Sequence, residues 1–527
     1  MANPVFKQNN QGEILLFPPR LDENIEEQHL VRVINSIVDK MDLSHLFSTY
    51  KGGGTSSFCP RMLLKVLLYA YCLKIYTGRK IANALKYDIT FMWLSGNQTP
   101  NFRTINNFRS GRLKESIEDI FKSVLEFMFQ EGYIRFDEYY CDGTTLIADA
   151  NKHKVIWRKY LEHYRQYIES RIESTIEEID RLNELDDQTY GSNDLPIKGG
   201  KDPEYKNKIE EAAEKINSIT NKKKLEKKAR EEARLRKTME MDTQRVESYK
   251  KKQDICKTRS GYSITDNDAT PMPIKECRED LRPAYNAMIG SENQFITGVS
   301  VHQNSNDGTC FKDHCNQVLT LIPKKIKLII ADAIFGTEEN YAFLEEENIS
   351  GLLKYPSYDK EQEKKFKNNI FTKQNMPYDP ISDSYECPNG RVLTYLGSGI
   401  KETTSGFRST YKKYGCADCS DCPFYQECAT TKEKRENKNH YFTISEDLER
   451  HKHNFRKKMQ TKRGKALFGR RKHDVETCFG DIKRNQSFRR VHLRGLEKVK
   501  TEFTVVAIAH NLRKIQQSIL RETKETA

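Results

Sequence analysis

Three acidic residues far apart in the chain, Asp142, Asp332 and Glu476, have the side chains best suited to metal-dependent chemistry. Each is expected on an element that can reach one edge of a mixed sheet: a strand for Asp142, a strand end for Asp332 and a late helix for Glu476. Three carboxylates can hold two Mg2+ or Mn2+ ions, because these hard cations prefer oxygen ligands. Such a pair of ions would activate a water or a 3′-hydroxyl and stabilise the leaving oxygen during in-line attack at phosphorus.

Glu476 lies in a basic stretch that the spacing of its apolar residues predicts to be helical. One face of this helix carries Glu476, Gly480 and Lys483. The neighbouring face is apolar, as in a helix that packs on a core, and consists of Val475, Phe479 and Ile482. Residues 450–500 contain 18 Lys or Arg against 4 Asp or Glu, an excess that favours a polyphosphate partner. The alternative is a solvated basic helix whose glutamate only pairs with neighbours three or four residues away.

A second group of ligand-type residues is the cysteine cluster, which consists of Cys416, Cys419, Cys422 and Cys428 at the spacing C-x2-C-x2-C-x5-C. Four sulfurs at this spacing predict a structural zinc site, in which Cys387 can substitute for one ligand. Two alternatives stay open: an iron–sulfur site, because such motifs also begin with C-x2-C-x2-C, and uncoordinated thiols. The chain has 13 cysteines, mostly scattered, which is typical of reduced thiols rather than of a disulfide framework.

The composition excludes a membrane-embedded protein. Hydrophobic residues make up 37% and charged residues 31% of the 527-residue chain, and the mean hydropathy is −0.78. No run approaches the roughly 18 apolar residues of a membrane-spanning helix. The sequence starts without the basic-then-apolar pattern of a signal peptide, so a cytoplasmic protein is expected. The net charge of +13 permits a nucleic-acid partner where the charge is concentrated.

The first part of the chain is predicted to be helical. Residues 1–20 are polar with paired prolines and are expected to form a loose arm, and residues 21–130 have the apolar periodicity of an all-α domain. Its expected exposed basic residues are Arg79, Lys80, Arg103, Arg109, Arg112 and Lys114. This set is compatible with a helix-turn-helix that reads a DNA end. A helical packing or dimerisation domain is the alternative.

Strand patterns follow. Residues 139–148 predict a strand or a strand pair with Asp142 near a bend, although Asp-Gly is also an ordinary hairpin turn. Residues 284–289 and 295–302 predict a β-hairpin whose loop is formed by residues 290–293.

Residues 326–332 form a nearly continuous apolar run that ends in Asp332. Such a run predicts a central strand buried on both faces, with Asp332 at its carboxyl end, where open α/β sheets place their sites. A helix is expected to begin after Thr337. As the alternative, Asp332 merely leads the chain into that helix.

Two segments are predicted to be insertions. Residues 157–256 are highly charged and have the periodicity of an antiparallel helical hairpin, expected to serve self-association or DNA contact, with a solvated spacer as the alternative. Residues 356–459 are polar, contain short β patterns and carry the cysteine cluster. After the helix that bears Glu476, residues 499–515 predict a last amphipathic helix.

These motifs together resemble the DDE transposases of bacterial insertion sequences, whose core is an RNase H-like fold. The three acidic motifs read Cys141-Asp142-Gly143-Thr144, Ala331-Asp332-Ala333-Ile334-Phe335-Gly336 and Val475-Glu476 through Phe479-Gly480-Asp481-Ile482-Lys483-Arg484-Asn485. The helical first domain is similar to the family's N-terminal domain at Pro60-Arg61-Met62, Tyr76-Thr77-Gly78-Arg79 and Thr104-Ile105-Asn106-Asn107-Phe108-Arg109. A cysteine cluster before the glutamate is found in one branch of the family.

The resemblance implies an α/β fold in which residues 131–156, 257–355 and 460–520 form an RNase H-like mixed sheet with flanking helices. The all-α domain would precede this core, and residues 157–256 and 356–459 would interrupt it.

By the same resemblance, Asp142, Asp332 and Glu476 are the catalytic triad that binds Mg2+ or Mn2+. The residues expected to contact DNA are Arg471, Lys472, Lys483, Arg484 and Arg494. The family often has Tyr and Arg seven and four positions before the glutamate, where this chain has Gly469 and Lys472. Lys472 can still bind phosphate as a point charge, but without the two-pronged hydrogen bonding of arginine.

The function implied is a Mg2+-dependent transposase that binds the terminal inverted repeats of its element, cuts the strand and joins the 3′ ends to target DNA. Its partners would be double-stranded DNA and further copies of the chain, as a homodimer or higher oligomer, in the bacterial cytoplasm at the nucleoid, with no membrane partner. The alternatives are a non-catalytic DNA-binding protein derived from such an enzyme and a metal-dependent nuclease without strand transfer.

Overall fold

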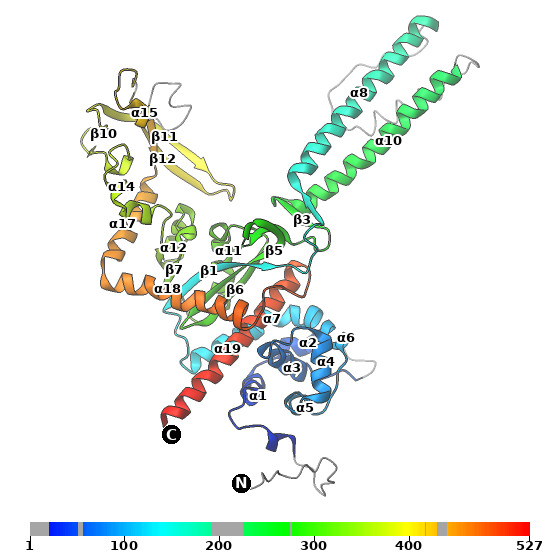
Figure 1. Cartoon of the computed structure of the whole chain (residues 1–527), viewed down its shortest axis with the longest axis vertical. Helices are drawn as coiled ribbons and strands as arrows, with labels where there is room; N and C mark the ends of the chain where they lie inside the picture. Colours follow the sequence, from blue (N-terminus) through cyan, green and yellow to red (C-terminus); the bar gives the residue numbers. More distant parts are fainter. Residues whose placement is uncertain are drawn as a thin grey trace, which may run out of the picture. The chain divides into compact units, whose positions relative to one another are not determined.

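The computed structural model of the chain (Figure 1) describes residues 20–50, 56–190, 225–274, 277–416, 418–428 and 440–526. The expected arm lies outside these ranges except for its last residue. The chain divides into two compact units, Met1–Asp149 with Ala284–Ala527 and Ala150–Pro283.

A mixed sheet forms the centre of the first unit. Its strands lie in the order β6-β5-β1-β7-β8, with the bounds Phe295–His302, Cys277–Glu292, Glu138–Ile147, Leu328–Ala331 and Ser350–Leu353. β5 pairs antiparallel with β6 and β1, whereas β1 with β7 and β7 with β8 are parallel. β7 lies between two neighbours and is almost entirely buried, so the central strand predicted near residues 326–332 is confirmed. The mixed α/β class is confirmed with it.

Helices cover both faces of this sheet. On one face, α11 (Asp307–Leu321) and α12 (Glu338–Glu346) share an apolar cluster with Tyr139 and Cys141 of β1. Further helices that contact its strands include α18 (Lys462–Gly480) and α19 (Leu496–Thr526), with the π-helical turn η5 (Asp481–Asn485) after α18. Glu138 and Thr144 of β1 meet side chains of α18 and η5. Because alternate residues of a strand point to opposite faces, α18 lies across the sheet from α11.

Two strand predictions were wrong in detail. Residues 138–147 form one continuous strand, which was one of the two predicted alternatives, but Asp142 lies in its middle rather than near a bend. The hairpin strand β5 continues through the expected loop to Glu292, and the turn is made by Asn293 and Gln294, both with positive φ (54° and 63°). Two consecutive residues with positive φ are typical of the tight turn that matches the twist of paired strands.

The N-terminal part of the chain is helical, as predicted. Its elements are η1 (Leu21–Asn24), α1 (Leu30–Lys40), α2 (Ser44–Ser48), α3 (Pro60–Cys72), α4 (Gly78–Tyr87), α5 (Ile89–Ser95), α6 (Phe102–Asn107), the π-helical η2 (Phe108–Arg112) and α7 (Leu113–Gln130). Proline at the first position of α3 and side-chain caps at Thr77, Asp88 and Asn101 account for several of the starts.

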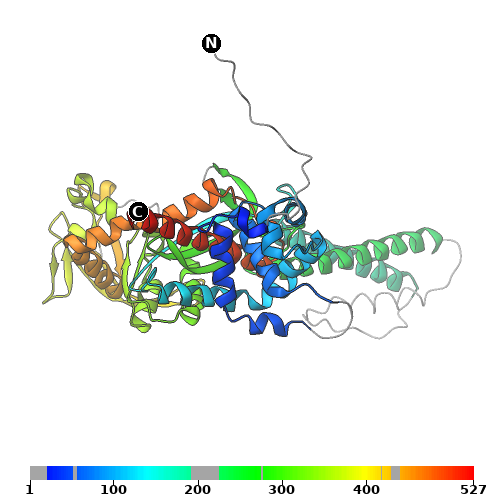
Figure 2. The same ribbon diagram turned by 90° about the horizontal axis from the view of Figure 1, so that it is seen from below.

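Helix α19 is the core partner of these helices. It packs against α1, α3 and α7 (Figure 2) as well as against β6. Residues 501–512 of α19 are buried without interruption, so the expected amphipathic helix is instead covered on all sides through its middle. α3 is buried over nearly its whole length for the same reason.

A buried polar network joins the two helical regions. Arg109, expected among the exposed basic residues, is only 4% exposed and lies 3.9 Å from the carboxylate of Glu502 on α19. Tyr71 donates a hydrogen bond to Glu502 (3.0 Å), and the backbone amides of His492 and Leu493 donate to its other oxygen. Although burial alone raises it, the hydrogen bonds from the ring and the backbone amide of His492 and the charge of Arg109 hold the pKa of Glu502 below its usual value. Arg109 therefore fixes the fold and is not open to DNA.

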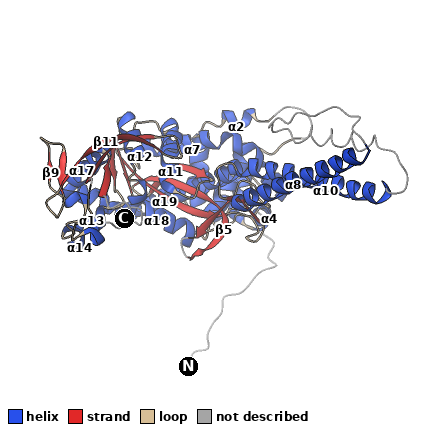
Figure 3. Ribbon diagram, turned by 90° about the horizontal axis from the view of Figure 1, so that it is seen from above, coloured by secondary structure: helices blue, strands red, loops and turns tan. Residues whose placement is uncertain are grey.

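The second unit contains two long helices that lie side by side, α8 (Arg158–Tyr190) and α10 (Leu225–Cys256), as Figure 3 shows. Apolar contacts between Ile168, Ile172 and Val246 hold them together, with an ion pair from Arg171 to the buried Asp242 (2.7 Å). The unit also has strands β2 (Val155–Trp157), β3 (Gly261–Ser263) and β4 (Thr270–Ile274). Residues 191–224 of the predicted helical hairpin lie outside the described residues.

The segment that carries the cysteine cluster belongs to the first unit. It forms an antiparallel sheet in the order β13-β12-β11-β10-β9, with the bounds His440–Ile444, Arg408–Cys416, Val392–Glu402, Ser384–Glu386 and Tyr378–Asp379. The short helices of the unit are η3 (Ala333–Phe335), α13 (Tyr358–Gln362), α14 (Lys364–Lys367), η4 (Lys373–Asn375) and α15 (Tyr425–Cys428), and α17 (Glu446–Gln460) leads into α18. Among the described helices, none is long and apolar enough to cross a membrane.

Candidate active site

The three predicted acids come together around one guanidinium group. Arg471 of α18 lies 3.0 Å from the Glu476 carboxylate, 3.5 Å from that of Asp332 and 3.7 Å from that of Asp142. Asp142, Asp332, Glu476 and Arg471 are here called the acid cluster. In sequence, Asp142 and Asp332 are 190 positions apart, and Asp332 and Glu476 are 144 positions apart. The structure therefore brings together the side chains that the sequence analysis selected.

Strand register explains why the two aspartates are neighbours. Cys141 of β1 pairs with Ala331 of β7 in a parallel ladder, so the next residue of each strand, Asp142 and Asp332, leaves the ladder at the same edge. Asp332 then turns the chain into η3, where its carboxylate accepts a hydrogen bond from the amide of Ala333 (2.6 Å). Its position at the carboxyl end of a central parallel strand agrees with the prediction.

Helix α18 is fixed beside this edge by two acids that the sequence analysis did not interpret. Asp474 is buried and accepts hydrogen bonds from Ser291 (2.6 Å) and from the amide of Gln294 (3.1 Å), and burial raises its pKa. Asp481 binds His510 (2.8 Å) and Arg513 (2.6 Å) of α19. Burial alone would raise the pKa of Asp481, but these two partners hold it well below its usual range. Both acids tie α18 to its neighbours.

The acid cluster carries a surplus of negative charge. The side chains of Asp332 and Glu476 are 44% exposed, that of Asp142 is 15% exposed and that of Arg471 is 9% exposed. Three carboxylates face one guanidinium, and two of the three separations exceed the usual length of a hydrogen bond. The buried Nε of Arg471 has no hydrogen-bond partner. One arginine thus neutralises only part of the charge, and further cations would be stabilised here.

The donor set suits a divalent metal ion, but the acids are not close enough together to hold one as they stand. In the described part of the chain, no group of three Asp, Glu, His or Cys side chains has the arrangement of a metal site. In the acid cluster the reason is visible, since the guanidinium of Arg471 lies among the carboxylates. Oxygen ligands with a net negative charge on the open side of the site fit Mg2+ or Mn2+.

The basic residues expected to contact DNA have different surroundings. Lys472 and Arg484 are exposed. The ammonium of Lys483 donates hydrogen bonds to Thr144 Oγ1 (2.6 Å) and Thr145 O (2.8 Å) on β1. Arg494 is exposed but pairs with Asp149 (2.9 Å). Arg471 is buried among the acids rather than on an open surface.

The burial of Arg471 could have been predicted from its position in the helix. Arg471 lies four residues before Val475, on the same face of the helix as the buried Val475 and Cys478. A basic residue in register with an apolar face is expected to be buried with a partner. Arg109 follows the same rule, since it is four residues after Ile105 and four before Leu113, which are both buried.

Gly143 is a second feature that sequence reasoning misread. Asp-Gly was interpreted as a turn signal, but Gly143 lies inside β1. A Cβ atom at this position would approach the carboxylate of Asp307 to 2.6 Å. Asp307 begins α11 and accepts a hydrogen bond from the side chain of Asn286 (2.6 Å). Glycine is thus needed for a close approach between strand and helix, next to Asp142.

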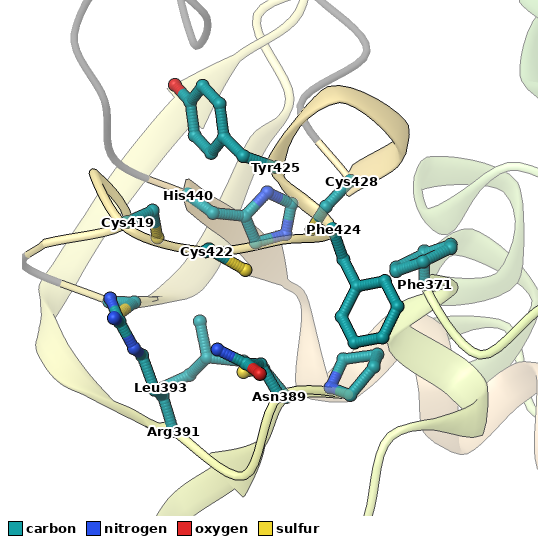
Figure 4. A pocket seen from close by; sticks show the side chains of 13 residues that line it. Phe371, Asn389, Arg391, Leu393, Cys419, Cys422, Phe424, Tyr425, Cys428 and His440 are labelled. Carbon is teal, nitrogen blue, oxygen red and sulfur yellow. The ribbon is translucent and has the colours of Figure 1, made fainter.

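The residues of the cysteine cluster line one small cavity of about 20 Å³, together with Cys387 and His440. Figure 4 shows Cys419, Cys422, Cys428 and His440 around it. These are zinc-type ligands, although no three of them reach the arrangement of a metal site among the described residues. Burial, with a smaller contribution from the adjacent Cys416 thiol, raises the pKa of Cys419 to about 12. A metal would have to displace this proton.

Comparison with known protein families gives two matches. The family described as Transposase DDE domain matches residues 386–516, a range that includes the cysteine cluster and Glu476. The family described as Transposase domain (DUF772) matches residues 19–111, which include α1 to α6. No curated protein and no solved structure matches the chain.

Proposed function

We propose that this chain, which the two family matches indicate to be a DDE-type transposase of the insertion-sequence type, binds the terminal inverted repeats of its element, cuts the DNA there and joins the 3′ ends to target DNA. The observation that carries the proposal is the convergence of Asp142, Asp332 and Glu476 on Arg471. These acids come from three distant segments and lie together beside the carboxyl end of the central strand β7, where open α/β sheets place their sites. An RNase H-like core is supported by the mixed sheet, which is antiparallel over β6-β5-β1 and parallel over β1-β7-β8.

In this proposal, Asp142, Asp332 and Glu476 hold Mg2+ or Mn2+. The bound ions would activate a water or a 3′-hydroxyl and stabilise the leaving oxygen at phosphorus. Arg471 keeps the three carboxylates together by attraction at 3.0–3.7 Å. Lys483 braces the strand beside Asp142 through Thr144 and Thr145, and the exposed Lys472 and Arg484 bind the DNA backbone.

The remaining assignments follow the same reasoning. Zinc in the cysteine cluster would stabilise the small sheet of residues 378–444, because the five cysteines and His440 line a single cavity. DNA is the proposed macromolecular partner, since residues 450–500 carry 18 basic against 4 acidic side chains. A second copy of the chain is proposed to act on the other end of the element.

The test removes the charge of each acid while keeping its size. Asp142→Asn, Asp332→Asn and Glu476→Gln should retain DNA binding but lose cleavage of a pre-bound end in Mg2+ by about 10²- to 10³-fold, since metal-held charge stabilisation contributes several kcal/mol. Because the three acids act as a unit, a double variant should be little worse than a single one.

The control is Glu497→Gln, which changes an exposed acid in the first turn of α19. Asp474 and Asp481 are unsuitable controls, because both are buried or ion-paired and support α18. Near-normal cleavage by the Glu476→Gln protein would exclude the proposed triad. Cleavage without joining of 3′ ends would instead identify a nuclease.

A further inference from the structure

A second cavity lies at the end of α18, beyond the acid cluster. It has a volume of about 350 Å³ and is bordered by α18, η5, α19 and the turn between β5 and β6. The lining residues that matter for its chemistry are Gly480, Asp481, Arg484, Arg513, Lys514 and Gln294. All of these elements belong to the first unit.

Gly480 is a helical glycine for which the fold supplies no steric reason. Its φ is −60°, an ordinary helical value, and a Cβ atom added here would meet nothing within 4 Å. Alanine would stabilise a helix by about 0.5–1 kcal/mol relative to glycine. A bare position at the rim of a cavity keeps the space open for a ligand that approaches the helix backbone closely.

The same face of the helix is bare at a second point. Gly469 also has nothing within 4 Å of its added Cβ. It lies seven residues before Glu476, and Gly480 lies four residues after it, so the three share one helical face. A linear ligand that passes Glu476 along α18 would therefore meet little side-chain obstruction at Gly469 or at Gly480.

The charges of the cavity select an anion. Asp481 is neutralised by Arg513 at 2.6 Å, with His510 at 2.8 Å on the same carboxylate. Arg484 and Lys514 supply the remaining positive charge. Lys514 donates a hydrogen bond to the neutral side-chain oxygen of Gln294 (3.1 Å), while the charges of Asp474 and Asp481 favour its protonated form. Burial lowers the pKa of Lys514, because its charged form is partly removed from water. A bound anion would offset this cost of desolvating the ammonium group.

We propose that this cavity binds a backbone phosphodiester of the DNA strand that runs along α18. The proposal rests on the proposed function and extends it with a specific DNA-binding subsite formed by Gly480, Arg484 and Lys514. The step of four positions from Glu476 to Gly480 spans about 6 Å of helix axis. This is about the rise of two nucleotides at 3.4 Å each, so the bound phosphate would be about two nucleotides from the reacting one.

The experiment measures the affinity of the full chain for a fluorescently labelled duplex by anisotropy, without added Mg2+ or Mn2+, over a series of salt concentrations. Lys514→Gln should lower the slope of log affinity against log salt by about 1, as expected for one lost phosphate contact. Gly480→Leu should fill the cavity and weaken binding about tenfold, as expected for the loss of a hydrogen bond to a charged group. Gly480→Ala should fold at least as well as the unchanged protein and bind more tightly than Gly480→Leu.

Lys524→Gln is the matched control, because Lys524 is an exposed lysine of the same helix that lies outside residues 450–500 and does not line the cavity. It should leave the salt slope nearly unchanged, and no variant should melt at a lower temperature than the unchanged protein. If Lys514→Gln and Gly480→Leu bind with unchanged affinity and slope, the subsite does not exist, while the proposed function stands. If the unchanged chain itself fails to bind duplex DNA, both proposals are wrong.

Discussion

The acid cluster and the cysteine cluster are both sets of potential metal ligands, but the fold prepares them differently. The acids are held by regular elements, on β1, at the end of β7 and on α18, and an internal cation already lies among them at 3.0–3.7 Å. Most of the cysteines lie on loops, at a strand end or in a four-residue helix around a cavity of about 20 Å³.

This difference between the two clusters shows which ligands of a metal site a protein can hold in place without the metal. Carboxylates repel one another, so a fold that brings three together needs a compensating cation at once. Thiols are neutral when protonated and can lie together without a counter-charge, so their final arrangement can be set by the metal itself. The acid cluster should thus be ordered without metal, and the cysteine cluster should depend on it.

The largest expected effect concerns zinc. Purified protein should contain about one zinc per chain, with an apparent binding free energy on the order of 10 kcal/mol, and Cys422→Ser should release most of it. Metal analysis measures the content, and Cys59→Ser, at an exposed cysteine outside the cluster, is the control. A brown protein with visible absorbance would indicate an iron–sulfur site instead of zinc. A protein without metal would indicate that the thiols are uncoordinated.

A smaller effect is expected in the reactivity of the metal-free cluster. With a pKa of about 12, Cys419 should have on the order of a thousandfold less thiolate at pH 8 than an ordinary cysteine. Because the pKa is raised, its alkylation should increase about tenfold with each pH unit from 8 to 10. Mass spectrometry of iodoacetamide-labelled peptides checks this, with the exposed Cys59 as reference. Rapid alkylation of Cys419 at pH 7 would contradict the burial that the structure describes.

The smallest effect concerns the internal cation of the acid cluster. Arg471→Gln should lower the free energy of unfolding by about 1–2 kcal/mol in EDTA, less than for a fully buried pair because two of the acids are 44% exposed. Mn2+ should then raise the melting temperature of this variant more than that of the unchanged protein, because it binds a site with a larger negative surplus.

Arg470→Gln is the matched control for this change. Arg470 is the preceding residue of α18 and pairs with Glu138 at 2.8 Å near the surface, so its loss should change the stability by less than about 1 kcal/mol. Equal melting curves for the Arg471→Gln and Arg470→Gln proteins in EDTA would show that Arg471 stabilises the fold no more than a surface ion pair does. The acid cluster would then not need an internal cation, and it would no longer differ from the cysteine cluster in this respect.

The sequence predicted the parts of the fold that follow from short-range patterns. The apolar run before Asp332, the cap at Thr337 and the apolar face of Val475, Phe479 and Ile482 all appear as expected. These features depend on periodicity and on hydrogen bonds within a few residues, and such signals survive in a single sequence.

What the sequence did not predict depends on contacts over long separations. Arg471 and Arg109 were counted among surface cations, but each is buried against acids from other segments. The glycine at 143 is required by Asp307, which is 164 positions later by number (307 − 143). Local periodicity can place such residues on a buried face, but it cannot identify the distant residue that they meet.

The packing of α3 against α19 also has a consequence for the order in which the chain folds. Tyr71 and its hydrogen-bond partner Glu502 are 431 residues apart in sequence. During synthesis at about 5–20 residues per second, α3 leaves the ribosome on the order of half a minute before α19. Throughout that interval the apolar surface of α3 lacks its native cover, so the first helices complete their core only when α19 arrives.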